Sequence, residues 1–239
     1  MNTTIAVLAV VFFLIGFFAS SVPALSWLVL VAWILTFIIF YQWSHAINMN
    51  IKNTKNVFSV LKDRVDDPLR GEIGFFVNRL DDFLIQSWSY WAAIIFLIIS
   101  WVILVFGVLG SVGSFAIGNV AGGAVIAVWA IILFLIVLII AGIFLAIYLS
   151  SIFRSTNKLS DLKDKIYTYL SGKKSLGFQK SIYRIPSRSV AWLFIPLVNI
   201  IYLLYIIIKL SYDINEYLNE DEKLIPEFER VFSETTPKP

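Results

Sequence analysis

The chain contains no cysteine and only one histidine, His45. Without cysteine it has no disulfide bond, no thiolate metal ligand and no cysteine nucleophile. One histidine is too few for the usual zinc, haem or copper sites. We therefore expect no metal ion and no cofactor.

Charge is also missing from three long parts of the sequence. Residues 1–44, 83–153 and 189–208 contain no Asp, Glu, Lys, Arg or His, and the whole chain is 59% hydrophobic. Soluble domains are about 45–50% apolar, and a charge in hydrocarbon costs several kcal/mol. The sequence therefore predicts an all-α, polytopic transmembrane protein whose extra apolar surface faces lipid.

Five apolar segments are long enough to cross the membrane, because about 20 helical residues span ~30 Å of hydrocarbon. They are residues 4–20, 23–43, 88–110, 120–150 and 190–210. Backbone groups in lipid must bond within their own segment, which favours helices. Pro196 and Asn199 interrupt the fifth segment, so a re-entrant hairpin is the alternative to a full crossing there.

The charged residues form three blocks, and their signs predict an orientation. Block 44–88 has 6 basic and 6 acidic residues, block 154–188 has 9 and 2, and block 209–239 has 4 and 8. Lys and Arg beside span ends mark the cytoplasmic side, and 15 of the 19 are in the first two blocks. Five crossings then place the N-terminus inside and the acidic tail outside. A prokaryotic cytoplasmic membrane is the default location.

Amphipathic aromatic side chains prefer the headgroup layer, and several lie near the predicted cytoplasmic ends of the spans. These are Tyr41, Trp43, Trp88, Tyr90, Trp91, Tyr148 and Trp192.

The predicted organisation alternates membrane hairpins with charged extensions. It consists of a transmembrane hairpin (1–43), an amphipathic cytoplasmic helical hairpin (44–87), a second transmembrane hairpin (88–153), a basic cytoplasmic segment (154–189), the fifth segment (190–210) and the acidic tail (211–239).

Local signals predict where several helices begin and end. Asp67 and Pro68 suit the first turn of a helix, which we expect to run on into the third span without a break. The apolar periodicity after the fourth span extends to Leu170, which predicts one helix of about 50 residues. Gly107, Gly110 and Gly113 indicate a flexible end of the third span, and Pro226 should interrupt the tail helix.

Three surfaces are candidate interaction sites. An apolar stripe at helical spacing is a candidate partner-docking face: Ile73, Phe76, Val77, Leu80, Phe83 and Leu84. Small residues four apart let helix backbones approach closely and predict packing within the chain or against a partner: Gly118, Gly122, Gly123, Ala127, Gly142 and Ala146. A basic run could bind anionic lipid headgroups or only fix the topology: Lys173, Lys174, Lys180, Arg184 and Arg188.

Chemistry at membrane depth needs ionisable groups or ligands, and the predicted spans have none. Asn199 is a polar residue within the fifth segment, and His45 is more typical of an interfacial hydrogen bonder than of a functional group. No nucleotide-binding, zinc-protease or nucleophile motif is present. We therefore expect no enzyme and no nucleic-acid partner.

Two functions agree with this pattern. The first is a structural or accessory subunit of a larger membrane complex, in contact with lipid and with other subunits or identical copies. The second is an oligomeric channel or carrier for a neutral or apolar solute. The second needs a polar path, for which the candidates are Asn199, Ser100, Asn119 and Ser114.

Overall fold

The computed structural model of the chain describes residues 3–18, 23–63, 67–173, 182–195 and 198–233. The structure is 91% helical, and no strand occurs in these residues. Four helices are long and apolar enough to cross a membrane, and one further apolar helix is shorter. The predicted class, an all-α transmembrane protein, is confirmed.

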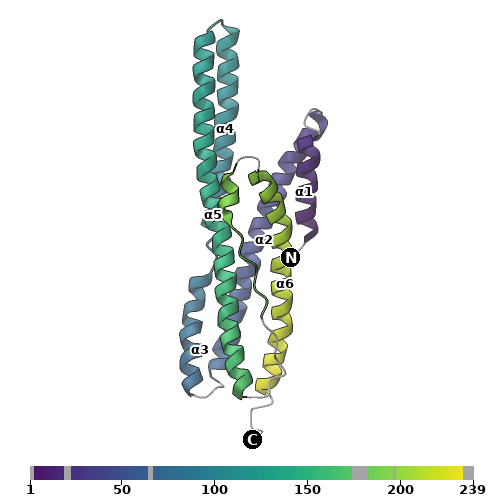
Figure 1. Cartoon of the computed structure of the whole chain (residues 1–239), viewed down its shortest axis with the longest axis vertical. Coiled ribbons are helices and arrows are strands. Elements are labelled where there is room, and N and C mark those ends of the chain that lie inside the picture. Colours follow the sequence, from purple (N-terminus) through teal and green to yellow (C-terminus); the bar gives the residue numbers. More distant parts are fainter. Residues whose placement is uncertain (1–2, 19–22, 64–66, 174–181, 196–197, 234–239) are drawn as a thin grey trace. The chain divides into compact units, whose positions relative to one another are not determined.

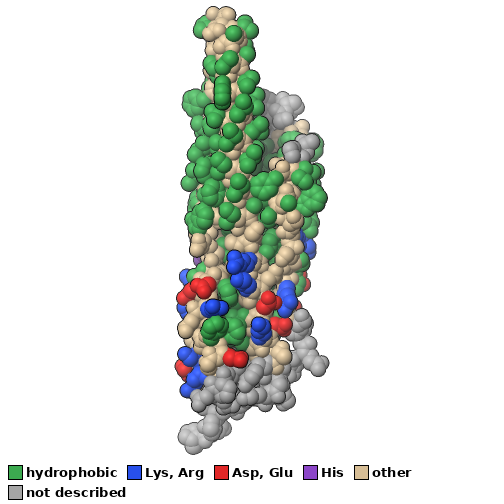
Figure 2. All heavy atoms as spheres, turned by 60° about the vertical axis from the view of Figure 1, so that its left-hand side comes forward, with side chains coloured by type: hydrophobic (Ala, Val, Ile, Leu, Met, Phe, Trp, Pro, Cys, Tyr) green, Lys and Arg blue, Asp and Glu red, His purple; other side chains and the backbone are tan. Residues whose placement is uncertain are grey.

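The helices form two compact units. One contains Met1–Ile85, Ser151–Arg188 and Leu203–Pro239, and the other contains Gln86–Ser150 and Ser189–Tyr202. All Lys, Arg, Asp, Glu and His residues fall in the first, which we call the charged unit, and the second, the apolar unit, has none. Figure 2 shows charged side chains gathered on one part of the surface and hydrophobic side chains on the rest of that face.

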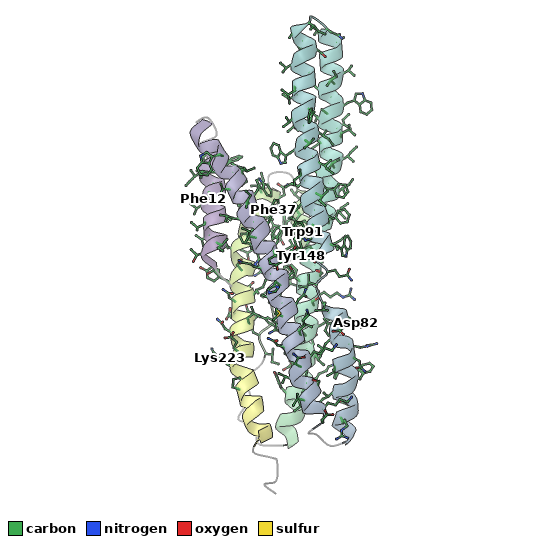
Figure 3. The ribbon with its side chains drawn as sticks, turned by 180° about the vertical axis from the view of Figure 1, so that it is seen from behind. Phe12, Phe37, Asp82, Trp91, Tyr148 and Lys223 are labelled. Atoms are coloured by element: carbon green, nitrogen blue, oxygen red, sulfur yellow. The ribbon has the colours of Figure 1, made fainter. Side chains whose placement is uncertain are left out.

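In the charged unit, α1 (Thr3–Phe18) and α2 (Pro23–Lys62) form an antiparallel hairpin (Figure 1). Gly16 allows its close approach, since a Cβ there would lie 2.8 Å from the backbone nitrogen of Val29. Figure 3 shows Phe12 and Phe37 on the two helices of this hairpin.

A ring contact fixes the level of the two helices. Phe13 meets Trp33 edge-on, with ring centroids 6.4 Å apart. Thr3 is ten residues before Phe13 on α1, and Trp43 is ten residues after Trp33 on α2. Because the two helices are antiparallel, Thr3 and Trp43 therefore lie at about the same level.

The chain does not run straight from the second cytoplasmic helix into the third span, as the sequence had predicted. Helix α3 (Asp67–Arg79) begins where expected, but it is followed by the 3₁₀ turn η1 (Leu80–Phe83) and a break before α4 begins at Trp88. Asn48 of α2 explains the break. Its side chain accepts from the Ile85 N–H (2.7 Å) and donates to the Ile85 carbonyl (3.0 Å), and so replaces both helical partners of that residue.

In the apolar unit, α4 (Trp88–Ala116) pairs with the first part of α5 (Val120–Lys173). The 54 residues of α5 confirm the predicted long helix. The predicted flexible end at Gly107, Gly110 and Gly113 is wrong, because α4 continues to Ala116. Gly107 is instead a contact point, since a Cβ there would lie 2.0 Å from the Cβ of Ala130.

After α5, residues 182–189 have no regular secondary structure, and we call them the strap. The 3₁₀ turn η2 (Val190–Phe194) and α6 (Val198–Ser233) follow. The predicted interruption at Pro226 is wrong, because α6 continues through it. Pro226 is exposed, so the carbonyl of Glu222, which loses its helical donor, can bond to water instead.

Hydrogen bonds align α2, α5 and α6 within the charged unit. Trp43 Nε1 donates to Ser211 Oγ (3.0 Å), and Tyr217 Oη donates to Asn50 Oδ1 (3.5 Å). Since both residue numbers increase together, α2 and α6 are parallel. Lys163 of α5 donates to the same Asn50 oxygen (3.3 Å), which places Lys163 at this level too. Figure 1 shows all three helices descending in the same direction.

This alignment brings the first charges of the three helices to one plane. Trp43 is level with Ser211 and with about residue 156 of α5. His45, Arg154 and Lys209 are the first ionisable residues after the three charge-free stretches, and each lies within about 3 Å of that level along its helix, at 1.5 Å per residue. We call this plane the charge boundary.

One contact bears on the predicted position of the tail outside the membrane, opposite the basic segment, which stays a prediction. Arg188 of the strap donates to Asp213 of α6 at 2.5 Å, and a hydrocarbon layer cannot separate the two members of an ion pair. By length and composition Val198–Glu220 of α6 could cross a membrane. Whether residues 190–210 cross fully or re-enter stays a prediction, and the Arg188–Asp213 pair favours the re-entrant alternative.

A glycine substitution tests the close contact of α4 with α5. In Gly107→Ala the added methyl group overlaps Ala130, and we expect a loss of about 1–3 kcal/mol of stability. Gly113→Ala is the matched control on the same helix, because nothing lies within 4 Å of a Cβ there. Thermal unfolding in detergent measures both. Equal stability of the two variants would contradict the contact.

Candidate functional site: a buried polar network in the charged unit

The network is centred on the Asp213 carboxylate of α6, whose side chain is only 1% exposed. It accepts hydrogen bonds from Arg188 Nη2 (2.5 Å), from Lys209 Nζ (3.0 Å) and from Tyr183 Oη (3.4 Å). Two cations therefore face one buried carboxylate. The surplus positive charge is accommodated because Lys209 is half exposed.

Arg188 is held firmly in its charged form. Burial acts to lower its pKa, but hydrogen bonds with Asp213 and Tyr205 outweigh it and raise the pKa above the ordinary value. The guanidinium carbon also lies 5.8 Å from the centre of the Tyr205 ring. The pair is thus a permanent ionic link between the strap and α6.

Tyr183 is held in its neutral form. Burial, followed by the negative charges of Asp213 and Glu216, raises its pKa to about 12. Its backbone N–H also donates to Glu220 of α6 (3.1 Å). The phenol serves here as a hydrogen-bond donor and not as an acid or base near neutral pH.

The other side of the strap is attached to α5. Ser160 Oγ donates to the Tyr183 carbonyl (3.1 Å), and Asn157 Nδ2 donates to Ser187 Oγ (3.0 Å). Arg184 pairs with Asp161 at 3.0 Å and with Asp164 at 3.3 Å, but all three side chains are largely exposed. The strap therefore joins α5 to α6 along the length of the charged unit.

A second group of polar side chains is buried between α2, α5 and α6. Asn50 of α2 accepts from Lys163 and from Tyr217, and the Lys163 ammonium lies 5.5 Å from the centre of the Tyr217 ring. All three residues are buried. Because the group takes one side chain from each of three helices, it sets their relative register.

The chemistry available to this network is limited. Within the described residues no three His, Cys, Asp or Glu side chains come together as a metal site. His45 stacks on Tyr41, with ring centroids 5.7 Å apart. The carboxylates are bound by cations and by a phenol with a high pKa, an arrangement that suits structural linkage more than proton transfer.

The structure distributes the predicted small-residue positions between a turn and two contacts. Gly118 lies in the turn between α4 and α5 with φ 78°, a conformation that favours glycine. A Cβ on Gly123 would meet the Phe115 ring at 2.8 Å, and one on Gly142 would meet Phe194 at 3.3 Å. Gly122 lies beside the Asn119 side chain, Ala127 is half-buried and Ala146 is buried.

The predicted docking stripe faces the chain's own core. Ile73 and Leu80 are completely buried. The other four residues are half-buried: Phe76, Val77, Phe83 and Leu84. A partner at this face stays a prediction, and it would have to bind beside Ile73 and Leu80 without contacting them.

Two of the predicted headgroup residues are engaged within the chain. Arg184 and Arg188 form the ion pairs described above. Lys174 and Lys180 lie outside the described residues, and Lys173 is the last residue of α5. Headgroup binding by this run stays a prediction.

The four predicted polar-path residues differ in burial and in their hydrogen bonds, and a path through them stays a prediction. Ser100 is buried and donates to the Leu97 carbonyl of its own helix (2.6 Å). Asn119 accepts from the Gly122 N–H (2.9 Å) at the start of α5. Asn199 is half-buried near the start of α6, and Ser114 is half-buried in α4.

Sequence reasoning missed the most connected residues. Asp213 is one of eight acidic residues in its block, and only its place on the buried stripe with Leu210 and Ile214 could have indicated it. The same pattern indicates Asn50 and Lys163, because each is a polar residue at a position where the helical periodicity predicts an apolar one.

No known protein family, curated protein or solved structure matches the chain.

Removing the central carboxylate tests the network. In Asp213→Asn the Arg188 charge stays buried without a counter-ion, and we expect a loss of about 3–5 kcal/mol, the usual cost of breaking one half of a buried pair. Arg184→Gln is the control, because its exposed pairs are worth at most about 1 kcal/mol. Denaturant titration in detergent measures both. If Arg184→Gln lost as much stability as Asp213→Asn, the buried pair would contribute no more to stability than the exposed pairs, which would contradict the prediction.

Proposed function

We propose that the protein is a non-catalytic subunit of a larger integral membrane complex and that it contacts its partners through the α4–α5 hairpin. The observation that carries this proposal is the length of that hairpin. It is longer than one bilayer requires, and its surplus surface is apolar.

The aromatic residues of the hairpin give a scale for its depth. Trp88 and Trp91 are exposed, and Tyr148 lies beside them, 5.4 Å from Tyr90 between ring centroids. Figure 3 shows Trp91 and Tyr148 close together. Exposed tryptophans favour the interface, so this group supports one interface position. The exposed Trp129 of α5 lies 19 residues before Tyr148, about 28 Å away, close to the ~30 Å thickness of hydrocarbon.

Trp101 does not offer a better second interface. It is only 13 residues after Trp88, about 19 Å along α4, which is too short for a bilayer. Its ring packs edge-on against Phe134, with centroids 6.3 Å apart.

The hairpin extends beyond Trp129. Nine further residues of α5 back to Val120 add about 13 Å, whereas one headgroup layer is only about 5–7 Å deep. This tip exposes large apolar residues and has no charge: Val108, Leu109, Val112, Phe115, Ile117, Val120, Val125 and Val128. Apolar surface outside hydrocarbon is unfavourable unless it is covered, which favours a protein partner at the tip.

The α1–α2 hairpin gives an internal comparison. Its charge-free part of α2, residues 23–43, is about 31 Å long, which one bilayer accommodates. The corresponding part of the α4–α5 hairpin, from Tyr148 back to Val120, is about 42 Å long.

The orientation follows from the charge boundary. All 19 Lys and Arg residues belong to the charged unit, and short basic segments stay on the cytoplasmic side. We propose that both termini are cytoplasmic, with residues 189–208 entering and leaving the membrane from that side. A prokaryotic cytoplasmic membrane is the proposed location.

Photo-crosslinking in native membranes tests the proposed contact. A benzophenone amino acid replaces Ile117, which is 81% exposed at the tip, or Ile139, which is 55% exposed within the span, as the matched control. We expect Ile117 to capture one membrane protein that also co-purifies in fixed stoichiometry, and Ile139 to give mainly lipid adducts.

Two results would contradict this function. One is lipid adducts alone at both positions. The other is solute flux by the purified protein in liposomes, which would indicate a channel or carrier.

A further inference from the structure

Among the described residues of the charged unit, one exposed pair of cations forms no ion pair with a carboxylate. Arg154 and Lys158 lie one helical turn apart on the exposed face of α5. Arg154 makes no hydrogen bond, ion pair or ring contact within the described part of the chain. Like charges at this spacing destabilise a helix by a few tenths of a kcal/mol, so the pair favours an anion between the two side chains.

Nearby groups hold this pair in place without neutralising it. The Lys158 ammonium lies 5.8 Å from the centre of the Phe83 ring, a contact that orients the cation and leaves its charge. The next acid on the same face, Asp161, pairs with Arg184 at 3.0 Å. Asp81, beside Phe83 in η1, pairs with Lys55 at 2.5 Å.

The depth of the pair indicates the source of the anion. Arg154 is the first charged residue after 71 uncharged positions, 83–153. It lies at the charge boundary, where α2 and α6 also acquire their first ionisable residues. Arg154 is six residues, about 9 Å, past Tyr148 of the aromatic group on α5. Its long side chain can extend back toward the headgroup phosphates, and an Arg fork with a neighbouring Lys suits phosphate oxygens.

We propose that Arg154 and Lys158 bind the phosphate of an anionic phospholipid at the charge boundary. The inference rests on the charged unit alone and not on the proposed role as a subunit. It assigns headgroup binding to residues other than the basic run 173–188, in which Arg184 and Arg188 are already paired.

Lipid titration of the purified full chain tests this site. Native mass spectrometry counts the lipids retained from mixed micelles that contain phosphatidylglycerol or, as the zwitterionic counterpart, phosphatidylcholine. At about 1 kcal/mol per cation, Arg154→Gln and Lys158→Gln should each weaken phosphatidylglycerol binding about fivefold, and the double variant about thirtyfold.

Lys165→Gln is the matched control. Lys165 lies on the same exposed face of α5, seven residues past Lys158 and thus about 10 Å further from the boundary. It should bind phosphatidylglycerol as the unmodified chain does. All four proteins should retain the same thermal unfolding temperature, because the exchanged side chains are exposed.

The result that supports the proposal is selective loss of phosphatidylglycerol in the Arg154 and Lys158 variants. It is overturned if the double variant binds like the unmodified chain, if Lys165→Gln loses as much, or if phosphatidylcholine binds equally well. A competition experiment with inorganic phosphate distinguishes a lipid headgroup from a free anion. If millimolar phosphate displaces the lipid, the site recognises a free anion and the lipid assignment is wrong.

Discussion

The free-energy cost of placing a charge in hydrocarbon determines where the charged residues of this molecule lie. The Arg188–Asp213 pair links two of the charged blocks within one unit. Every Asp, Glu, Lys, Arg and His belongs to one compact unit, although the three charged blocks are separated by long uncharged stretches. The pair joins the end of the basic block to the acidic tail. It supports the proposal that residues 189–208 return to the side that they left, a point that the hydropathy of the chain leaves open.

Alignment of three parallel helices has a second consequence. Hydrogen bonds set the register of α2, α5 and α6. They join Trp43 to Ser211, and Asn50 to Lys163 and Tyr217. Because charge begins at the same level on all three, the charge boundary is a natural place for the edge of the membrane. Arg154 lies at that boundary and has no partner among the described residues, so we place the proposed headgroup contact there and not at the paired arginines of the strap.

Features governed by local sequence could be predicted. The apolar period of α5 predicted its length, the Asp67–Pro68 pair predicted the start of α3, and charge-free runs predicted the fold class. Features decided by distant contacts could not. The break before α4 depends on Asn48, which is 37 residues from Ile85, and the side on which the tail lies depends on a pair 25 residues apart. Likewise, the candidate site joins polar residues that look ordinary in sequence and become informative only through burial.

The most direct measurement is the accessibility of single cysteines in sealed, oriented vesicles, which the absence of native cysteine makes unambiguous. Lys52→Cys, Lys165→Cys and Asn219→Cys place one exposed thiol on each of α2, α5 and α6. The account predicts that a membrane-impermeant maleimide labels all three from the same face. Labelling of Asn219→Cys from the opposite face would contradict it.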